Sequence, residues 1–194
     1  MKMKIWKELR AAVMATLALS LLLCVFYPLA VWSIAQIFFP WKANGSMIHG
    51  PKGPIGSILI SQSFTGPGFF HPRPSAAGSG HDPLSSGGSN LGPLSKTQFE
   101  QVKARIESFR RENRLGPGIP VPVDAVTASA SGLDPHISVD NALLQSLRIA
   151  ESREIPGEKV VELIARCTEN RQLGILGEKR VNVLLLNLEL EKLR

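Results

Sequence analysis

The chain has 194 residues, a net charge of +6 and a sequence pI of about 9.6. So basic a balance is common in nucleic-acid-binding proteins, but from Ala43 onward 17 Lys and Arg face 15 Asp and Glu. A nucleic-acid-binding domain needs a basic face of its own, so we expect no nucleic acid among the partners. The two cysteines, Cys24 and Cys167, lie in different kinds of sequence and are not expected to pair.

Residues 11–41 form an apolar stretch that contains no charged side chain. About 20 helical residues cross the hydrocarbon core of a bilayer, so this stretch is long enough to span it with tilt. Aromatic residues gather at its far end, as at a membrane interface. Pro28 should kink the helix rather than end it, because lipid leaves the backbone few alternatives to a helix. We predict a transmembrane helix over residues 11–41.

Two other interpretations of this stretch were weighed. A cleaved signal peptide has an apolar core of only about 7–15 residues, whereas here the apolar character continues to Trp41. A buried helix of a soluble protein needs other apolar segments around it, and the remaining chain has none that is comparable. Both interpretations are therefore less consistent with the sequence than a membrane span.

The charges that flank the helix predict its orientation. Residues 1–10 hold four basic residues and one acidic residue, whereas only Lys42 and Lys52 lie near the other end. The positive-inside rule then predicts a cytoplasmic tail over residues 1–10 and an extracytoplasmic domain over residues 42–194.

A domain of about 150 residues buries an adequate core without a disulfide. We therefore expect a single-pass protein of a bacterial inner membrane.

The first part of the outer domain is poor in regular structure. Residues 42–56 are a polar exit from the membrane, rich in Gly and Pro, and residues 57–61 (SILIS) predict a short strand. Residues 63–95 are mostly small and polar around three Phe residues, and a loop this long is usually functional or disordered. Because the Phe side chains need a place to be buried, we expect an ordered, irregular loop.

Helical signals follow this loop. Residues 95–115 show the apolar spacing of an amphipathic helix, with Ser95 or Thr97 as its cap. Residues 119–126 (IPVPVDAV) are expected to be extended, because each proline disfavours a helical conformation in its predecessor.

The C-terminal part predicts more helix than strand. Ser138 is expected to cap one helix and Pro156 to open another. Residues 181–190 fit either a single helix or a strand followed by a helix. The expected fold class is α+β: one N-terminal transmembrane helix followed by a mixed, helix-rich extracytoplasmic domain.

Few residues suggest catalysis. No P-loop motif is present, and the four histidines lack zinc-type spacing. Ser131, Asp134 and His136 are a conceivable nucleophile constellation. The competing interpretation is a turn, in which Gly132 supplies a positive φ and Asp134-Pro135 begins the turn. We favour the turn because no serine lies in a G-x-S-x-G motif.

Three other polar residues are more easily explained by structure than by chemistry. Arg73 lies between two prolines, where it either binds an anionic group or forms a salt bridge that fixes the loop. We favour the salt bridge. Asp124 and Thr127 are expected to hold the backbone.

Five stretches in order carry a resemblance that covers almost the whole chain. They are GSILISQSFTGPGFFHPRPSA (residues 56–76), SGGSN (86–90), VPVDAVTASASGLDPHIS (121–138), ALLQSLRIAESR (142–153) and VNVLLLNLEL (181–190). Together they resemble the C subunit of the bacterial potassium-transporting P-type ATPase, the KdpC family. The sequence FPWKANGS that follows the membrane helix fits this family as well.

The resemblance implies a non-catalytic subunit of a complex that imports K⁺ by ATP hydrolysis. The implied partners are a channel-like, K⁺-translocating subunit and a P-type subunit that hydrolyses ATP. This chain has no D-K-T-G-T sequence, so it is not expected to be the hydrolytic subunit. The resemblance also implies that the subunit raises the ATP affinity of the catalytic subunit, which conflicts with the predicted topology because ATP is cytoplasmic. ATP is therefore assigned no residues, and no catalytic or metal-binding residue is assigned.

Polar residues are the candidates for structural or partner-contact roles. Two functions of other classes stay open: a membrane-tethered extracytoplasmic hydrolase that uses Ser131 and His136, and a tethered protein that senses a ligand through the 63–95 loop. The candidate residues are Arg73, Ser89, Asn90, Asp124, Thr127, Ser131, Asp134, Gln145, Arg148, Asn182 and Asn187.

Overall fold

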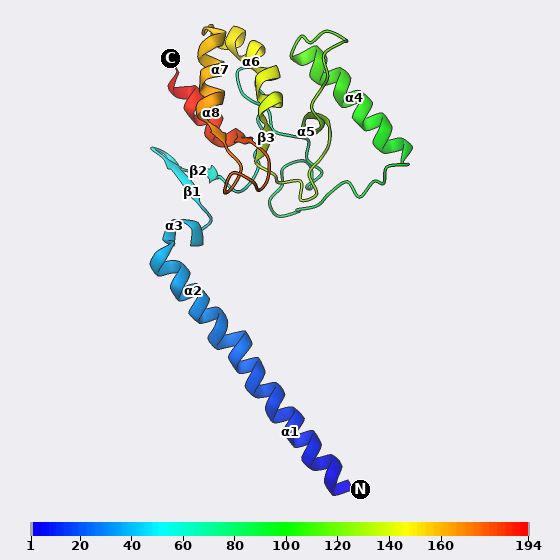
Figure 1. Cartoon of the computed structure of the whole chain (residues 1–194), viewed down its shortest axis with the longest axis vertical. Helices are drawn as coiled ribbons and strands as arrows, with labels where there is room; N and C mark the ends of the chain where they lie inside the picture. Colours follow the sequence, from blue (N-terminus) through cyan, green and yellow to red (C-terminus); the bar gives the residue numbers. More distant parts are fainter. Residues whose placement is uncertain (1, 194) are drawn as a thin grey trace. The chain divides into compact units, whose positions relative to one another are not determined.

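The computed structural model describes residues 2–193 and divides into two compact units. The first unit extends to Met47 and the second begins at Ile48. The first is almost entirely helical, whereas the second combines helices with short strands (Figure 1). The predicted class, one N-terminal apolar helix followed by a mixed and helix-rich domain, is confirmed as an arrangement of secondary structure.

The first unit is a continuous helical rod (Figure 1). It consists of α1 (Lys2–Leu21), a π-helical turn η1 (Leu22–Phe26) and α2 (Tyr27–Phe38). The stretch Lys4–Phe38 is long and apolar enough to cross a membrane, with a mean hydropathy of 2.2, and none of its most apolar window is buried. The helix therefore begins before the predicted residue 11, and residues 2–10 continue it.

Pro28 lies near the start of α2 without ending the rod. A proline inside a helix lacks an N–H and crowds the carbonyl of the preceding turn. The chain responds with the π-helical turn η1, in which the Tyr27 N–H donates to the Leu22 carbonyl, five residues back. A π-bulge is a common way to accommodate such a disturbance. The prediction that Pro28 does not end the helix is confirmed.

The polar exit after the rod is more structured than expected. It contains a short helix, α3 (Pro40–Ala43), and a hairpin of β1 (Met47–Gly50) and β2 (Gly53–Ser57). The predicted strand over residues 57–61 is wrong, because β2 ends at Ser57. The Ser57 hydroxyl accepts a hydrogen bond from the Leu59 N–H at 3.1 Å, which turns the chain there.

The second unit is built around a three-stranded antiparallel sheet in the order β3-β5-β4. Its strands are β3 (His136–Ser138), β4 (Thr168–Glu169) and β5 (Arg180–Asn182), and Ile137 pairs with Val181. Residues 181–190 fit either a single helix or a strand followed by a helix, and the structure shows the second: β5 ends at Asn182 and a helix begins at Val183.

Three helices gather beside the sheet and enclose the core (Figure 1). They are α6 (Val139–Arg153), α7 (Gly157–Arg166) and α8 (Val183–Lys192). The Ser138 hydroxyl accepts the Asn141 N–H at 3.1 Å, so the predicted cap of α6 is confirmed. Buried residues of the core come mainly from these helices, with one from the irregular loop: Phe70, Ile137, Ala142, Ile149, Ala150, Val160, Leu163, Ile164, Val181, Val183, Leu186 and Leu190.

Helix α4 (Lys96–Glu112) lies apart from these three helices and contains no fully buried residue (Figure 1). Its predicted cap is confirmed, since Ser95 Oγ accepts the Gln98 N–H at 3.3 Å. Its apolar face is only partly covered, because Phe99 is 72% exposed. The next segment was predicted to be extended, but it forms the short helix α5 (Val123–Val126) after Pro122.

The long loop before α4 is ordered and irregular, as predicted. Within the described residues, neither helix nor strand lies between Ser57 and Lys96. Phe70 is fully buried in the core and Phe64 packs against it. The rings of Phe64 and Phe69 lie with their centroids 5.9 Å apart. Aromatic burial therefore anchors the loop at its middle.

Candidate functional site

Side chains from the C-terminal half of the chain hold the irregular loop, and we call this set the polar clamp. A loop that buries its backbone needs such partners, because an unpaired buried N–H or C=O costs about as much as a lost hydrogen bond. Four of the five clamp residues were candidates from the sequence, and Arg153 was not. The clamp consists of Gln145, Arg148, Arg153, Asn182 and Asn187.

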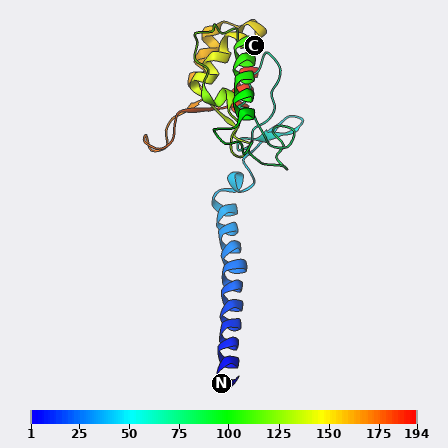
Figure 2. The same cartoon turned by 90° about the vertical axis from the view of Figure 1, so that its right-hand side faces the viewer.

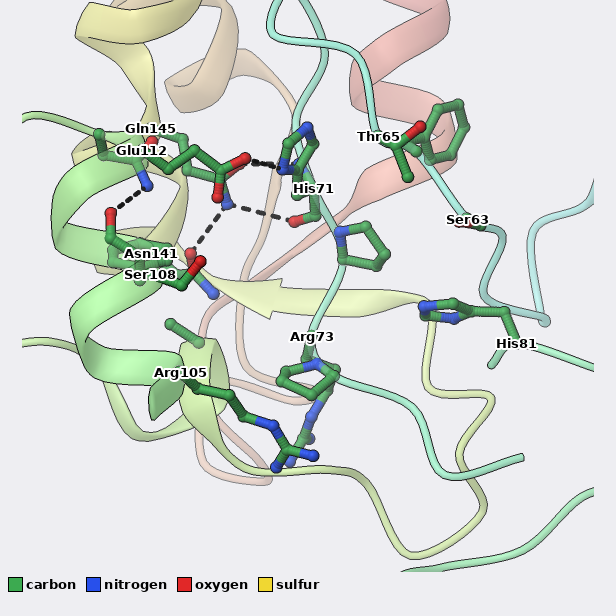
Figure 3. Close-up of a pocket in the computed structure, with 16 residues that line it drawn as sticks. Ser63, Thr65, His71, Arg73, His81, Arg105, Ser108, Glu112, Asn141 and Gln145 are labelled. Atoms are coloured by element: carbon green, nitrogen blue, oxygen red, sulfur yellow. Dashed lines mark hydrogen bonds and ion pairs between the residues drawn. The ribbon is translucent and has the colours of Figure 1, made fainter. Parts of the chain in front are cut away.

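Gln145 lies on α6, one helical turn after Asn141, and faces the loop (Figure 3). Its Oε1 accepts the His71 N–H at 2.7 Å. Its Nε2 donates to the His71 carbonyl at 3.2 Å and to Asn141 Oδ1 at 2.9 Å. Gln145 is only 1% exposed. The side chain thus pairs with both backbone groups of His71, as a neighbouring strand would.

Arg148 lies one turn further along α6 and is also buried. Its Nε donates to Asn113 Oδ1 at 3.0 Å, and its Nη1 donates to the carbonyls of Pro67 and Phe69, the latter at 3.0 Å. Burial lowers the pKa of the Arg148 guanidinium, and attraction by Glu112 opposes that shift. Arg148 therefore fixes two loop carbonyls and ties them to the end of α4.

Two asparagines from the end of the chain complete the clamp. Asn187 on α8 accepts the Phe70 N–H at 2.8 Å and donates to the Phe70 carbonyl at 3.0 Å. Asn182 donates to the Ile58 carbonyl at 2.8 Å and caps α8 by accepting the Leu185 N–H at 3.2 Å. The core helix α8 therefore fixes the loop at its start and at its middle.

Arg73 forms the salt bridge that the sequence predicted. Its Nη1 lies 2.8 Å from Asp134 Oδ2, and its Nη2 donates to the Thr127 carbonyl at 3.5 Å. Burial alone would raise the pKa of the Asp134 carboxyl, but hydrogen bonds from His136 and Arg73 outweigh it and lower the pKa from 3.8 to about 2. The pair joins the loop to the segment before β3.

Asp124 joins α5 to the cap of α6. Its carboxylate accepts hydrogen bonds from the Ser138 N–H and hydroxyl, both at 2.8 Å, and from Asn141 Nδ2 at 2.9 Å. Thr127 closes α5 by donating from its hydroxyl to the Val123 carbonyl at 2.7 Å. Both residues therefore hold backbone, as predicted.

A cavity of about 260 Å³ lies between the loop and helix α4 (Figure 3). At one end His71 Nδ1 is 2.9 Å from Glu112 Oε1, while His71 Nε2 lies 2.9 Å from the Gly66 carbonyl. At the other end are Arg73 and Arg105, and Arg105 donates to the Val126 carbonyl at 3.1 Å. Its charged side chains are thus engaged with the surrounding protein, and the arrangement braces the loop against α4.

Comparison with known proteins identifies the family. The model of the family described as "KdpC: K+-transporting ATPase, c chain" matches residues 9–192. The chain belongs to the KdpC family. Among relatives named potassium-transporting ATPase KdpC subunit, that of Rhodospirillum rubrum is 50% identical over 186 residues, which cover 96% of each chain. The relative from Koribacter versatilis is 47% identical over 185 residues, 95% of this chain and 94% of its own. The relative from Mycobacterium tuberculosis is 46% identical over 187 residues, 96% and 99% of the two chains.

The Ser131 region of this KdpC-family chain forms a turn. Ser131 Oγ accepts the Leu133 N–H at 3.1 Å, and Gly132 adopts φ +68°. The His136 ring lies 3.3 Å from Asp134 Oδ1 and 3.9 Å from Glu169 Oε2. Asp134 and His136 therefore meet, but the Ser131 hydroxyl is engaged by the turn, and this geometry favours the structural interpretation over the nucleophile.

Two candidates take part neither in the polar clamp nor in the contacts described for Arg73, Asp124, Thr127, Ser131 and Asp134. Ser89 and Asn90 are exposed in the loop, and Asn90 adopts φ +52°. Within the described part of the chain, the candidate residues do not form a group of three or more His, Cys, Asp or Glu able to hold a metal ion.

Sequence reasoning missed three buried or half-buried polar residues of this region: His71, Asn113 and Asn141. One signal was available for Asn141. It lies four residues before Gln145, and the two share a helix face with the apolar Ile149. A pair of amides on an otherwise apolar face predicts a buried hydrogen-bond network. No comparable signal marks His71, whose partner Glu112 lies 41 residues later.

Proposed function

We propose that this chain is the non-catalytic C subunit of a K⁺-transporting ATPase and that it acts as a membrane-anchored assembly subunit. The observation that carries the proposal is the family match over residues 9–192, which covers both the apolar helix and the second unit, called the outer unit from here on. The relatives named as KdpC subunits match over nearly their full lengths, so the likeness is not confined to one part.

The proposed anchor is the helix Lys4–Phe38. At 1.5 Å per residue its 35 residues measure roughly 50 Å, which exceeds a hydrocarbon core of about 30 Å. The surplus places Lys4, Lys7 and Arg10 among headgroups, where basic side chains mark the cytoplasmic side. The N-terminus is then cytoplasmic and residues 42–194 lie outside, in a bacterial inner membrane.

The proposed partners are the channel-like, K⁺-translocating subunit and the P-type, ATP-hydrolysing subunit of the same complex. The helix supplies an anchor in lipid, and the outer unit supplies a rigid surface because the polar clamp fixes its loop. We also propose that the subunit raises the ATP affinity of its catalytic partner. With the outer unit outside the cytoplasm, that effect is transmitted through the partner rather than by direct contact with ATP.

Co-purification tests the assembly. The full chain carries a C-terminal tag, the host grows short of potassium, and the membranes are extracted in mild detergent. We expect a many-helix subunit and a P-type ATPase to co-purify, with K⁺-stimulated ATP hydrolysis. A chain that emerges alone, from membranes without such activity, contradicts the proposal and returns attention to the tethered hydrolase or sensor.

Labelling of single cysteines tests the topology. Cys24 and Cys167 are replaced by serine, and one cysteine is introduced at Lys52 or at Lys7. A membrane-impermeant maleimide should label Lys52→Cys in intact spheroplasts and Lys7→Cys only after lysis. The reverse labelling pattern would place the outer unit in the cytoplasm, where it could bind ATP directly.

A further inference from the structure

Residues 170–179 form a hairpin arm between β4 and β5. Gln172 and Leu176 exchange both of their backbone hydrogen bonds at 2.9 Å, which closes a tip of Leu173, Gly174 and Ile175. The arm, orange-brown in Figure 2, extends away from the rest of its unit, and every residue of it is exposed.

The tip of the hairpin arm is apolar where solvent would favour polar residues. Leu173 is 89% exposed, Ile175 75% and Leu176 55%. Leu173 also adopts φ +54°, in the left-handed region that favours Gly or Asn over a residue with a bulky Cβ substituent. Leu173 thus departs from two local preferences, the one for Gly or Asn in a left-handed conformation and the one for polar residues at exposed positions. Such departures are expected at functional positions.

The arm is braced from its base. Arg171 Nη2 lies 2.6 Å from Glu178 Oε2 across the stem, and Arg180 Nε lies 2.9 Å from Glu169 Oε2 below it. These pairs are exposed and individually weak, but with the backbone hydrogen bonds of the hairpin they define one conformation. A preformed tip loses less conformational freedom on binding than a flexible one.

We propose that this tip docks into an apolar socket on another protein subunit of the same ATPase complex. The inference rests on the proposed function, since it needs a complex to dock into. Three aliphatic side chains bury far less than the roughly 800 Å² per partner of a standard interface. The arm is therefore one anchor point of the outer unit, in addition to the membrane helix.

The chemistry of the arm favours a protein socket over a lipid surface. Segments that rest at a membrane interface carry Trp or Tyr and free basic residues. The arm contains no aromatic residue. Arg171 and Arg180 are engaged with carboxylates, which leaves Lys179 as the arm's basic side chain without a carboxylate partner among the described residues.

A second copy of the chain is also a poorer occupant. The groove that the arm itself borders, about 720 Å³, is lined largely by polar and charged residues such as Asp140, Asn170 and Glu178. An aliphatic tip gains little from such a lining, because burial of polar groups without hydrogen-bond partners is unfavourable. An apolar socket supplied by a different subunit fits the tip better.

Photo-crosslinking in the assembled complex tests the docking. A diazirine-bearing residue replaces Leu173 in the full, tagged chain, and a control places it at Leu94, which is 97% exposed in the loop before α4. We expect the adduct at position 173 to contain another subunit of the complex, identified by mass spectrometry, and to be several-fold more abundant than the adduct at position 94. Adducts at 173 with lipid alone, with a second copy, or no more abundant than at 94 overturn the proposal.

A paired variant tests the energetics. Leu173→Asn with Ile175→Ser keeps a tip suited to its turn, since Asn tolerates the left-handed conformation, and Leu94→Ser is the matched surface control. We expect the first variant to release its partners at several-fold lower detergent concentration than the control, with unchanged thermal unfolding of the isolated chain. Equal retention by both variants overturns the docking while the complex itself still forms. If the wild-type chain retains no subunit at all, the proposed function fails and the inference falls with it.

Discussion

Asn187 offers the sharpest test of the polar clamp. Its amide accepts the Phe70 N–H and donates to the Phe70 carbonyl, so one side chain satisfies both backbone groups of a residue 117 positions earlier. Phe70 is fully buried and Asn187 is 2% exposed, so water cannot replace the lost partner without entering the core. Asn187→Leu keeps nearly the same shape and removes both hydrogen bonds.

The expected loss follows from the number of groups left unpaired. A buried donor or acceptor without a partner costs about 1–3 kcal/mol, so two such groups should lower the free energy of unfolding by about 2–6 kcal/mol. Domains are typically stable by about 5–15 kcal/mol. The substitution should therefore remove a large fraction of the stability of the second unit, although it changes little in volume.

The measurement is urea unfolding of the 48–194 unit followed by far-UV circular dichroism, since all three tryptophans lie before residue 48. Exchange of the Phe70 amide hydrogen supplies a local readout. Asn170→Leu, at an exposed asparagine, is the matched control and should change stability by less than about 0.5 kcal/mol. A loss below about 1 kcal/mol for Asn187→Leu, with the Phe70 amide still protected from exchange, would mean that the two hydrogen bonds do not stabilise the loop.

Three further predictions address other parts of the site. The carboxylate of Asp134 has a lowered pKa of about 2, so its stabilising effect is complete above about pH 4 and is lost as the pH falls toward 2. At pH 6 the thermal unfolding temperature of Asp134→Asn should therefore lie below that of the wild type. The difference between the two unfolding temperatures should decrease between pH 4 and pH 2. Arg148→Met leaves loop carbonyls unpaired and should destabilise the unit by about 3 kcal/mol or more in urea, whereas Arg111→Met, at an exposed position, should have little effect. Ser131→Ala removes one turn hydrogen bond and should leave subunit co-purification and K⁺-stimulated ATP hydrolysis intact; loss of hydrolysis in a folded variant would favour the hydrolase hypothesis.

The starts of α4 and α6 were predictable because their causes are local. Ser95 and Ser138 each accept an N–H three residues ahead, and such a cap is visible in a short sequence window. The continuity of the apolar rod was predictable for the same reason, since the 31 uncharged residues of 11–41 allow few alternatives to a helix.

The strands were not predictable in the same way. β3, β4 and β5 are two or three residues long, which is too short to show the alternation of apolar and polar residues that identifies a strand. β3 pairs with β5 across a long separation, since His136 lies opposite Asn182, 46 positions later, whereas β4 pairs with β5 across the hairpin arm, as Thr168 does with Val181. The SILIS stretch has a strand-like composition, but the Ser57 hydroxyl turns the chain before a strand can continue.

Four of the five clamp residues were candidates from the sequence, whereas their partners were found only in the structure. Gln145, Arg148, Asn182 and Asn187 all lie in the two C-terminal stretches that carry the family resemblance. Each of them forms hydrogen bonds with the loop backbone rather than with solvent or a partner protein. Those bonds join residues that are 74 to 124 positions apart in the sequence, so a short sequence window does not show them. Asn113 and His71 joined the same network with no local sign at all.

The dependence of the loop on distant side chains has a consequence for function. A segment from residue 58 to residue 95 without secondary structure of its own has no internal ladder to satisfy its backbone. Asn187 and Gln145 instead supply paired donors and acceptors from two helices, as edges of a sheet would. The conformation of the loop is therefore set by the core helices α6 and α8, and it should stay fixed whether or not a partner is bound. A partner subunit then meets a preformed surface, which lowers the ordering cost of assembly.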